Sequence, residues 1–273
     1  MKKLYTIIFS LITFIQINGQ VLISPYIVYT DQQNKFGTFL VQNESDEIYE
    51  ISVSFIFGYP VSDSIGQLSM RYIEQDSSEY YSIAQTLRAF PRKFLLNPKQ
   101  RQVVRMTVKT PDTLAAGTYW SRIVTSAAPH TIPTDTVNKG ITARIKFVLN
   151  QVTTVLYRVE PAETGINIKN VIVSVDSNQL KVISAFERTG NSPFFGNLFV
   201  KIIDSTQNVV EEKKEFMSVY FDLVKNVDFD LTKFKSGKFK AEIQIVLNEK
   251  EDIPESNFKP IEPIFRTVEF EIP

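Results

Sequence analysis

The sequence predicts an all-β protein that contains two β-sandwich domains in tandem. Apolar residues recur at every second position in many short segments, and this period is that of a strand with one buried face. Turn-forming residues separate these segments at short intervals, which is typical of a sandwich. The chain has 273 residues, of which 43% are hydrophobic, so it is long enough for two packed domains.

The first 19 residues have the layout of a secretory signal peptide. Lys2 and Lys3 give a positively charged start, residues 4–17 are almost continuously apolar, and Gly19 is a small residue at the expected cleavage point. A membrane anchor is the alternative, but a spanning helix needs about 20 apolar residues and this run is shorter. We therefore expect residues 1–19 to be removed and the mature protein to be exported to the periplasm.

We expect a first domain over residues 20–158. Pro25 interrupts its first strand, which suits an edge position because proline cannot donate a ladder hydrogen bond. Residues 59–81 are polar and predict a long loop or an insertion, with a hairpin at 67–74 as one option. Residues 83–88 fit either a short helix or a strand. The other segments with strand patterns are 23–29, 35–42, 48–57, 91–96, 102–108 and 118–126.

A long segment, 140–158, organises this domain and ends it. It is longer than most strands, which have roughly 3–10 residues. Its sheet could cover its apolar face, as for any half-buried strand, or something else could cover it. The residues of its apolar row are Ile141, Ala143, Ile145, Phe147 and Leu149.

We expect a second domain over residues 159–273, and its pattern is again that of a sandwich. Residues 190–193 and 204–208 are rich in turn-forming residues, and 249–263 is a polar loop that contains proline. The segments with strand patterns are 171–175, 180–184, 198–203, 219–223, 229–234, 238–247 and 265–272.

The residue types that most enzymes need are scarce in this chain. It has 0 Cys and 1 His, His130, so one chain cannot build a thiolate site, a histidine-based catalytic triad or a multi-histidine metal site. The sequence contains no glycine-rich phosphate loop and no nucleophile elbow. Its net charge is +0 without a basic stripe, which argues against nucleic acid as a partner. We expect a protein that is not an enzyme and that uses neither a metal nor a small-molecule cofactor.

An ordered series of motifs in the first domain resembles a known family. The series comprises 91–98 (PRKFLLNP), 103–105 (VVR), 110–112 (TPD), a Tyr/Trp strand at 118–126, and the long alternating strand that ends in Leu156-Tyr157-Arg158. This order is similar to that of the periplasmic chaperones of the chaperone–usher pilus pathway, the PapD-like proteins. The resemblance covers residues 21–158.

The resemblance implies two immunoglobulin-like sandwiches set at an angle. In that family the last strand of the first domain lends alternating apolar residues to an incomplete pilus subunit, a mode called donor-strand complementation. The implied partners are pilin-like subunits that lack a strand, and an outer-membrane assembly platform. Aligned through Leu156-Tyr157-Arg158, the lending residues map to Ile145, Phe147 and Leu149, with Ile141 and Ala143 earlier in the same row.

The sequence departs from the family at its charged anchor. The family holds the subunit's terminal carboxylate with an Arg and a Lys, but the matching positions here are Tyr26 and Thr154, and neither supplies a cation. The family also pairs an interdomain Arg, here Arg158, with a Glu on the preceding strand, and that place falls near Gly117. The strand-lending segment is therefore kept and the carboxylate anchor is not.

These observations favour an exported, chaperone-like protein that binds and stabilises pilus or other surface-structure subunits by donating an alternating apolar strand. The alternative is a structural or surface-assembly component in which the two sandwiches serve as spacers or docking modules. In that case the alternating face is internal, and a charge at Phe147 should unfold the first domain. A carbohydrate-binding module would rest on the 12% aromatic content alone.

Overall fold

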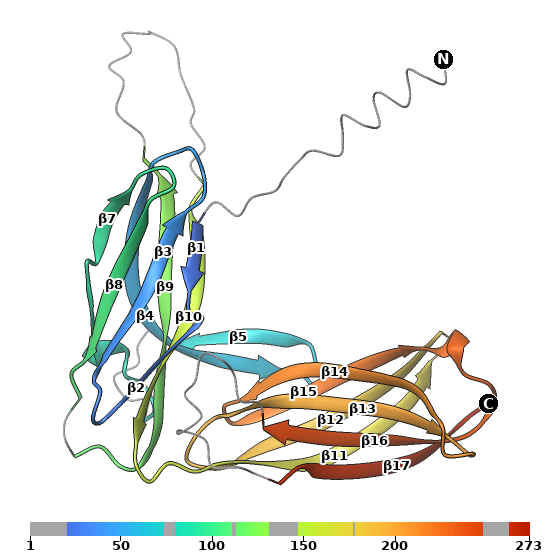
Figure 1. Cartoon of the computed structure of the whole chain (residues 1–273). Helices are drawn as coiled ribbons and strands as arrows, with labels where there is room; N and C mark the ends of the chain where they lie inside the picture. Colours follow the sequence, from blue (N-terminus) through green and yellow to red (C-terminus); the bar gives the residue numbers. More distant parts are fainter. Residues whose placement is uncertain (1–20, 74–79, 111–112, 131–146, 177, 248–261) are drawn as a thin grey trace, which may run out of the picture.

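The computed structural model describes residues 21–73, 80–110, 113–130, 147–176, 178–247 and 262–273 (Figure 1). These residues form strands and two short 3-10 turns, and no α-helix occurs among them. The all-β prediction is therefore confirmed. No helix in these described ranges is long and apolar enough to cross a membrane. The predicted signal peptide, 1–19, lies outside the described residues.

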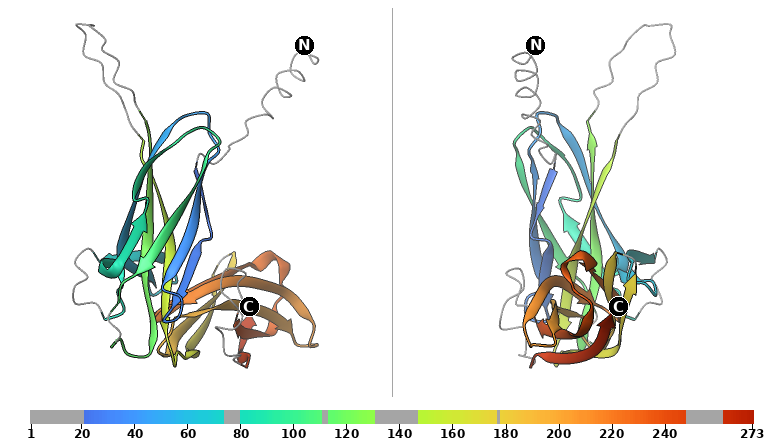
Figure 2. Two further views of the ribbon diagram at one scale, coloured as in Figure 1. Left: turned by 60° about the vertical axis from the view of Figure 1, so that its left-hand side comes forward. Right: turned by 90° about the vertical axis from the view of Figure 1, so that its right-hand side faces the viewer.

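The first sandwich consists of two sheets, which appear as separate layers in the right-hand view of Figure 2. One sheet has the order β1-β3-β8-β6, and its strands are β1 (Val21–Ser24), β3 (Phe36–Asn43), β8 (Arg101–Val108) and β6 (Leu87–Phe90). The other has the order β2-β10-β9-β4-β5, with β7 also paired to β4. Its strands are β2 (Ile27–Asp31), β10 (Leu149–Val159), β9 (Gly117–Pro129), β4 (Tyr49–Ser62), β5 (Leu68–Ile73) and β7 (Lys93–Leu96).

Pro25 divides the predicted first strand between the two sheets. Before it, β1 pairs with β3; after it, β2 pairs in parallel with β10. Because proline has no N–H, the hydrogen-bond ladder can end there without leaving a donor unpaired. The first strand therefore closes one side of the sandwich by contributing to both layers.

The structure decides two places in the first domain where the sequence left alternatives open. Residues 59–81 are not one long loop, because β4 continues to Ser62 and pairs with β5 as a hairpin. The segment 83–88 contains both alternatives in succession, a 3-10 turn at Ala84–Thr86 followed by β6. The start of the predicted long strand, 140–146, lies outside the described residues, and β10 begins at Leu149.

The second sandwich has seven strands in sheets of three and four, as in an immunoglobulin-like domain. The sheets have the orders β11-β12-β15 and β14-β13-β16-β17. The sequence did not predict β14, whose VVEEKKEFMSV lacks a clear apolar face. The strands are β11 (Thr164–Asp176), β12 (Gln179–Gly190), β13 (Phe194–Asp204), β14 (Val209–Val219), β15 (Asp222–Asp230), β16 (Gly237–Leu247) and β17 (Ile264–Ile272).

The two sandwiches lie across one another, so that the molecule has the shape of an L in Figure 1. Each has its own apolar core. A third apolar cluster, which we call the aromatic junction, joins them at the corner of the L. It contains buried residues of both domains: Ile27, Phe57, Trp120 and Leu156 from the first, and Phe195 and Tyr220 from the second.

Candidate strand-pairing site

The first half of β10 has a free edge. β10 pairs with β9 along its whole length, from Leu149 opposite Ala127 to Val159 opposite Gly117. On its other side β2 pairs with it only from Thr154 onward. Within the described part of the chain, residues 149–153 therefore have a strand neighbour on one side only. An unpaired strand edge is a template for pairing with another chain.

The direction of the main chain shows which groups this edge presents. The Thr154 N–H donates to the Tyr26 carbonyl at 2.9 Å, so Thr154 directs its main-chain groups toward the β2 side. In a strand, alternate residues direct both their N–H and their C=O to the same side. Asn150 and Val152 therefore direct theirs to the free edge. These four groups are spaced to receive an added strand.

Apolar side chains accompany the free edge. Phe147 is 79% exposed, Leu149 40% and Val152 40%. Leu149 lies on the same face of β10 as Val155 and Tyr157, because even numbers of residues separate them along the strand. Val155 and Tyr157 lie in the core of the first domain. Leu149 therefore lies on the core-facing side of β10 but outside the core, with the polar Gln151 and Thr153 between it and Val155.

The structure describes two of the five predicted donor residues. Leu149 is exposed at the start of β10, Phe147 is exposed two residues before it, and Ile141, Ala143 and Ile145 lie outside the described residues. That these five residues contact a client remains a prediction.

Tyr26 and Thr154 lie side by side, as the alignment of the anchor positions implies, and a buried arginine lies beside them. Tyr26 is exposed, whereas Thr154 is buried and its hydroxyl accepts a hydrogen bond from Arg122 Nη1. Arg122 Nε donates to the Gly58 carbonyl at 3.0 Å, and its guanidinium lies 5.0 Å from the Tyr220 ring centroid. Sequence analysis missed Arg122, although its alternation with Trp120 in TYWSRIVTS places both residues on one face of β9.

Arg158 is buried at the end of β10 and bonds to residues that follow it in the chain. Its Nε donates to Glu160 Oε1 at 2.6 Å and its Nη2 to the Ala162 carbonyl at 2.8 Å. Its neighbour on β9 is Thr118, so the preceding strand supplies no acid at this place. The carboxylate comes from Glu160, which also accepts from the Ala162 N–H at 3.0 Å. Arg158 therefore fixes the link between β10 and β11.

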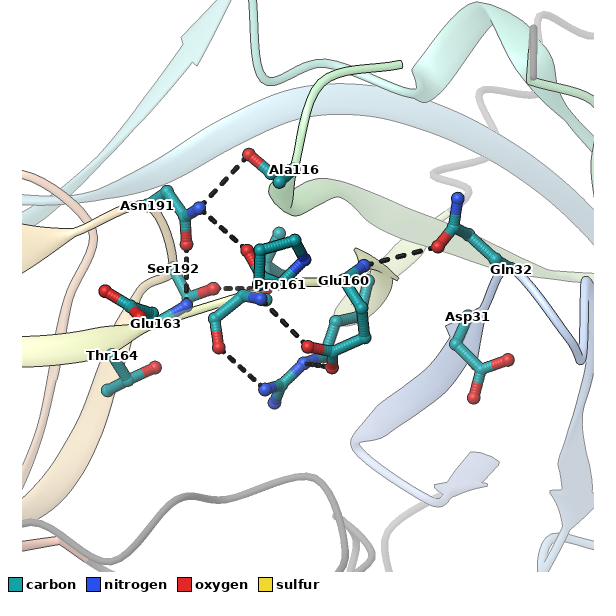
Figure 3. Close-up of polar contacts among 12 residues, drawn as sticks. Asp31, Gln32, Ala116, Glu160, Pro161, Glu163, Thr164, Asn191 and Ser192 are labelled. Atoms are coloured by element: carbon teal, nitrogen blue, oxygen red, sulfur yellow. Dashed lines mark hydrogen bonds and ion pairs between the residues drawn. The ribbon is translucent and has the colours of Figure 1, made fainter. Parts of the chain in front are cut away.

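Asn191 joins the two domains beside this link (Figure 3). Its side-chain amide donates to the carbonyls of Ala116, at 3.2 Å, and Pro161, at 3.1 Å, and its Oδ1 accepts from the Glu163 N–H at 2.7 Å. Gly117 passes so close that a Cβ there would lie 2.9 Å from the Asn191 carbonyl, and its φ is +143°. A side chain at Gly117 would therefore disturb the joint.

The aromatic junction supports the corner of the L from inside. Trp120 is fully buried, with its ring centroid 4.8 Å from that of Tyr220 and 4.9 Å from that of Tyr81. Arg188 donates to the Tyr81 hydroxyl at 3.0 Å. Burial raises the pKa of the Tyr29 hydroxyl well above its usual range, although nearby Arg158 lowers it. This direction follows from the burial of the Tyr29 ring beside the junction.

The described residues offer no metal centre. They contain no group of three or more His, Cys, Asp or Glu side chains that could hold a metal ion. His130 follows β9 and is exposed, and its N–H donates to the Ile48 carbonyl at 2.8 Å. The free half of β10 presents main-chain groups, the apolar Leu149 and Val152, and the polar Asn150 and Gln151, whose Nε2 donates to the Val21 carbonyl at 2.6 Å. Unpaired main-chain groups beside exposed apolar side chains suit binding to another polypeptide.

Comparison with known proteins gives structural likeness only. No family model matches the chain, and no curated protein matches its sequence. A chain of the complex between the Salmonella enterica SafA pilin and the SafB chaperone is 13% identical with a TM-score of 0.43; the match covers 92% of this chain and 97% of that one. The YadV chaperone is 10% identical with a TM-score of 0.46 and coverage of 92% and 100%.

A third similar structure is the CsuC–CsuE chaperone–tip subunit complex of Acinetobacter baumannii. It is 11% identical with a TM-score of 0.44, and the match covers 90% of this chain and 98% of that one. All three structures contain a chaperone, and two of them contain it together with a pilus subunit. Likeness at this level does not identify what this chain binds.

Proposed function

We propose that this chain is a chaperone-like binding protein that holds a β-rich client by adding the free edge of β10 to the client's sheet. The observation that carries the proposal is the half-paired state of β10. Residues 154–158 are enclosed between β2 and β9, while 149–153 have β9 alone. The rest of the strand is held firmly, so the free half is presented in extended form before any client arrives.

The expected energetics favour the side chains over the main chain. Asn150 and Val152 offer four main-chain groups, and a hydrogen bond contributes about 1 kcal/mol net. Burial of an exposed apolar side chain such as Phe147 or Leu149 contributes roughly 1.5–3 kcal/mol. Main-chain pairing would fix the register of the client, and the apolar row would supply most of the affinity.

The client that fits this site is a protein with an incomplete sandwich and an apolar groove. We expect Ile141, Ala143 and Ile145 to extend the row that Phe147 and Leu149 begin. The resemblance to the pilus chaperones supports pilin-like subunits as the clients, the periplasm as the compartment, and an outer-membrane platform as the place of delivery. Nothing in this mode requires catalysis or a cofactor.

The test is affinity capture from the native periplasm with the wild type beside Phe147→Glu. Because Phe147 is 79% exposed, the variant should keep its circular dichroism spectrum and melting temperature. It should lose a specific β-rich protein that copurifies with the wild type. Phe265→Glu is the matched control, since Phe265 is an exposed phenylalanine on β17 of the second domain.

Two results would overturn the proposal. One is capture of the same client by Phe147→Glu and the wild type in equal amounts. The other is a wild type that captures no partner together with a Phe147→Glu variant that unfolds. The second result would favour the structural-component alternative, in which Phe147 belongs to an internal contact.

A further inference from the structure

The outward-facing strand residues of the β1-β3-β8-β6 sheet include arginine and phenylalanine but no acid. One carboxylate lies at the end of this face, where Glu44 Oε1 accepts a hydrogen bond from Gln42 Nε2 just beyond β3. Alternate residues of these strands, such as Val41, Val104 and Met106, point into the core, so the others form the outer face. We call it the arginine–phenylalanine face. Its residues are Leu22, Ser24, Phe36, Thr38, Leu40, Gln42, Arg88, Phe90, Arg101, Val103, Arg105 and Thr107.

The strand register places the rings beside the guanidinium groups. Phe90 of β6 lies opposite Arg105 of β8, and Arg88 lies opposite Thr107, whose other neighbour is Phe36. Phe36 is 67% exposed and Phe90 78%. The face is therefore a compact mixture of cations and exposed rings.

The arginines of this face lack the counter-charges that several lysines of the second domain have. Arg88 donates to the carbonyls of Gln85 and Leu87, both at 2.7 Å, and no ion pair occurs for Arg88, Arg101 or Arg105 within the described ranges. On the outer face of the second domain, lysines lie opposite acids across the strands. Two such pairs are Lys201 with Glu242, at 3.8 Å, and Lys240 with Glu269, at 3.4 Å. An ordinary solvated sheet face mixes both signs of charge, as the face of the second domain does, whereas the arginine–phenylalanine face carries cations alone.

We propose that the arginine–phenylalanine face binds an acidic protein surface, separate from the client held on β10. Interface cores are enriched in arginine and aromatic residues and depleted of lysine and acids, which is the composition of this face. Arginine also binds carboxylates through two parallel hydrogen bonds, whereas lysine offers a point charge. The expected partner surface presents carboxylates around an apolar patch.

The shape of the sheet favours a protein over a lipid surface. Neighbouring strands are rotated by roughly 20–25° with respect to each other, so the outer face of a four-stranded sheet is strongly twisted. Leu22 on one edge strand and Phe90 on the other therefore cannot meet one flat plane. A folded partner can follow this twist, and a bilayer cannot.

The test selects random 12-residue peptides displayed on phage against the full chain. The comparison variant is Arg88→Glu/Arg101→Glu/Arg105→Glu, which changes exposed residues only. The control, Lys235→Glu/Lys238→Glu/Arg266→Glu, makes the same change in net charge on exposed residues of the second domain. Selected peptides should carry Asp or Glu around apolar residues. They should lose at least about tenfold in affinity on the first variant and little on the control.

Three results would overturn this proposal. The selected peptides could show no enrichment in acids, or they could bind the arginine variant as well as the wild type. The chain could instead bind vesicles of phosphatidylcholine and phosphatidylglycerol through the same arginines while no peptide does. Phe147→Glu should leave peptide binding unchanged, so failure of this proposal is distinct from failure of the client proposal.

Discussion

The two sandwiches share an architecture but differ in the strands that form the edges of their sheets. In the first, β10 leaves residues 149–153 without a neighbour on one side within the described structure. In the second, the outer strand β14 carries an unbroken run of acids and lysines from Glu211 to Glu215, and charged edges discourage pairing with other chains. The first domain itself covers the edge of β15, because Ser62 Oγ of β4 accepts from the Val224 N–H at 2.6 Å. These two outer strands of the second domain are therefore less suited to pairing with another chain than residues 149–153 of the first.

The distribution of charge follows the same division. Lysine–acid pairs lie between the strands of the second domain, for example Lys225 with Glu215 at 2.6 Å. The outer sheet face of the first domain has arginines and exposed rings without acids. The aromatic junction joins these unlike domains. The two domains therefore differ in surface charge pattern although they share a buried junction.

The largest expected effect comes from removing the joint between the two domains. Trp120→Ala creates a cavity in the junction and should cost about 3–5 kcal/mol of unfolding free energy. Because Trp120 contacts Tyr220 of the second domain, the two sandwiches should then unfold in separate steps. Differential scanning calorimetry would show two transitions in place of one.

Trp120→Phe is the matched control, because it keeps a ring in the junction. It should lose less stability than Trp120→Ala and retain closer coupling of the transitions. A Trp120→Ala variant that melts in one step at the wild-type temperature would contradict the role given to the junction. The domains would then be joined mainly through Asn191 and the link after β10.

A pair of proline substitutions separates the free edge of β10 from its paired edge. Val152 directs its N–H to the free edge, so Val152→Pro removes no ladder bond and should weaken client binding with little loss of stability. Thr153 directs its N–H to β9, where it lies opposite Ile123. Thr153→Pro should therefore cost about 1–3 kcal/mol of unfolding free energy. Chemical denaturation and client capture measure the two effects.

The comparison of the two edges fails if the two prolines destabilise the protein equally. That result would mean that an unseen neighbour already occupies the free edge. Val152→Ala is the control for the loss of the side chain, since alanine keeps the N–H that proline removes.

Period-two alternation was enough to predict the fold class and most strands. It failed where another domain stabilises the element. The β4–β5 hairpin contains Pro60 and Gly66 and reads as a loop, but Ser62 bonds to Val224 and Gly66 lies against Asn226 of the second domain. The sequence did not predict β14 for a different reason. Its buried contacts with the core begin only at Met217, so most of the strand has no apolar face to detect.

The candidate site shows the same division between local and distant information. Alternation placed Phe147 and Leu149 in one apolar row, and both are exposed, Leu149 at the start of β10 and Phe147 just before it. Arg122 and Asn191 were not predicted, because their importance depends on which strands become neighbours. Arg122 reaches Gly58 of β4, and Asn191 reaches Ala116, 75 residues earlier in the chain. A period within one strand carries no information about such contacts.

The smallest expected effect concerns acid and falls on the second domain. Hydrogen bonds from Thr206 and Asn208 lower the pKa of Asp204, and those from Thr232 lower the pKa of Asp230. A carboxyl whose pKa is lower folded than unfolded stabilises the protein above the unfolded value, which is about 3.9. This contribution is lost as the pH falls through the folded pKa.

Urea unfolding between pH 7 and pH 2.5 should therefore show a modest decline in stability below about pH 4. The double variant Asp204→Asn/Asp230→Asn should show a smaller decline in stability below about pH 4. Asparagine can accept the same turn hydrogen bonds but does not titrate. Both carboxylates are at the surface, so the effect should be well below that of Trp120→Ala. Equal acid dependence in the wild type and the variant would show that these two turns do not set the acid limit of the second domain.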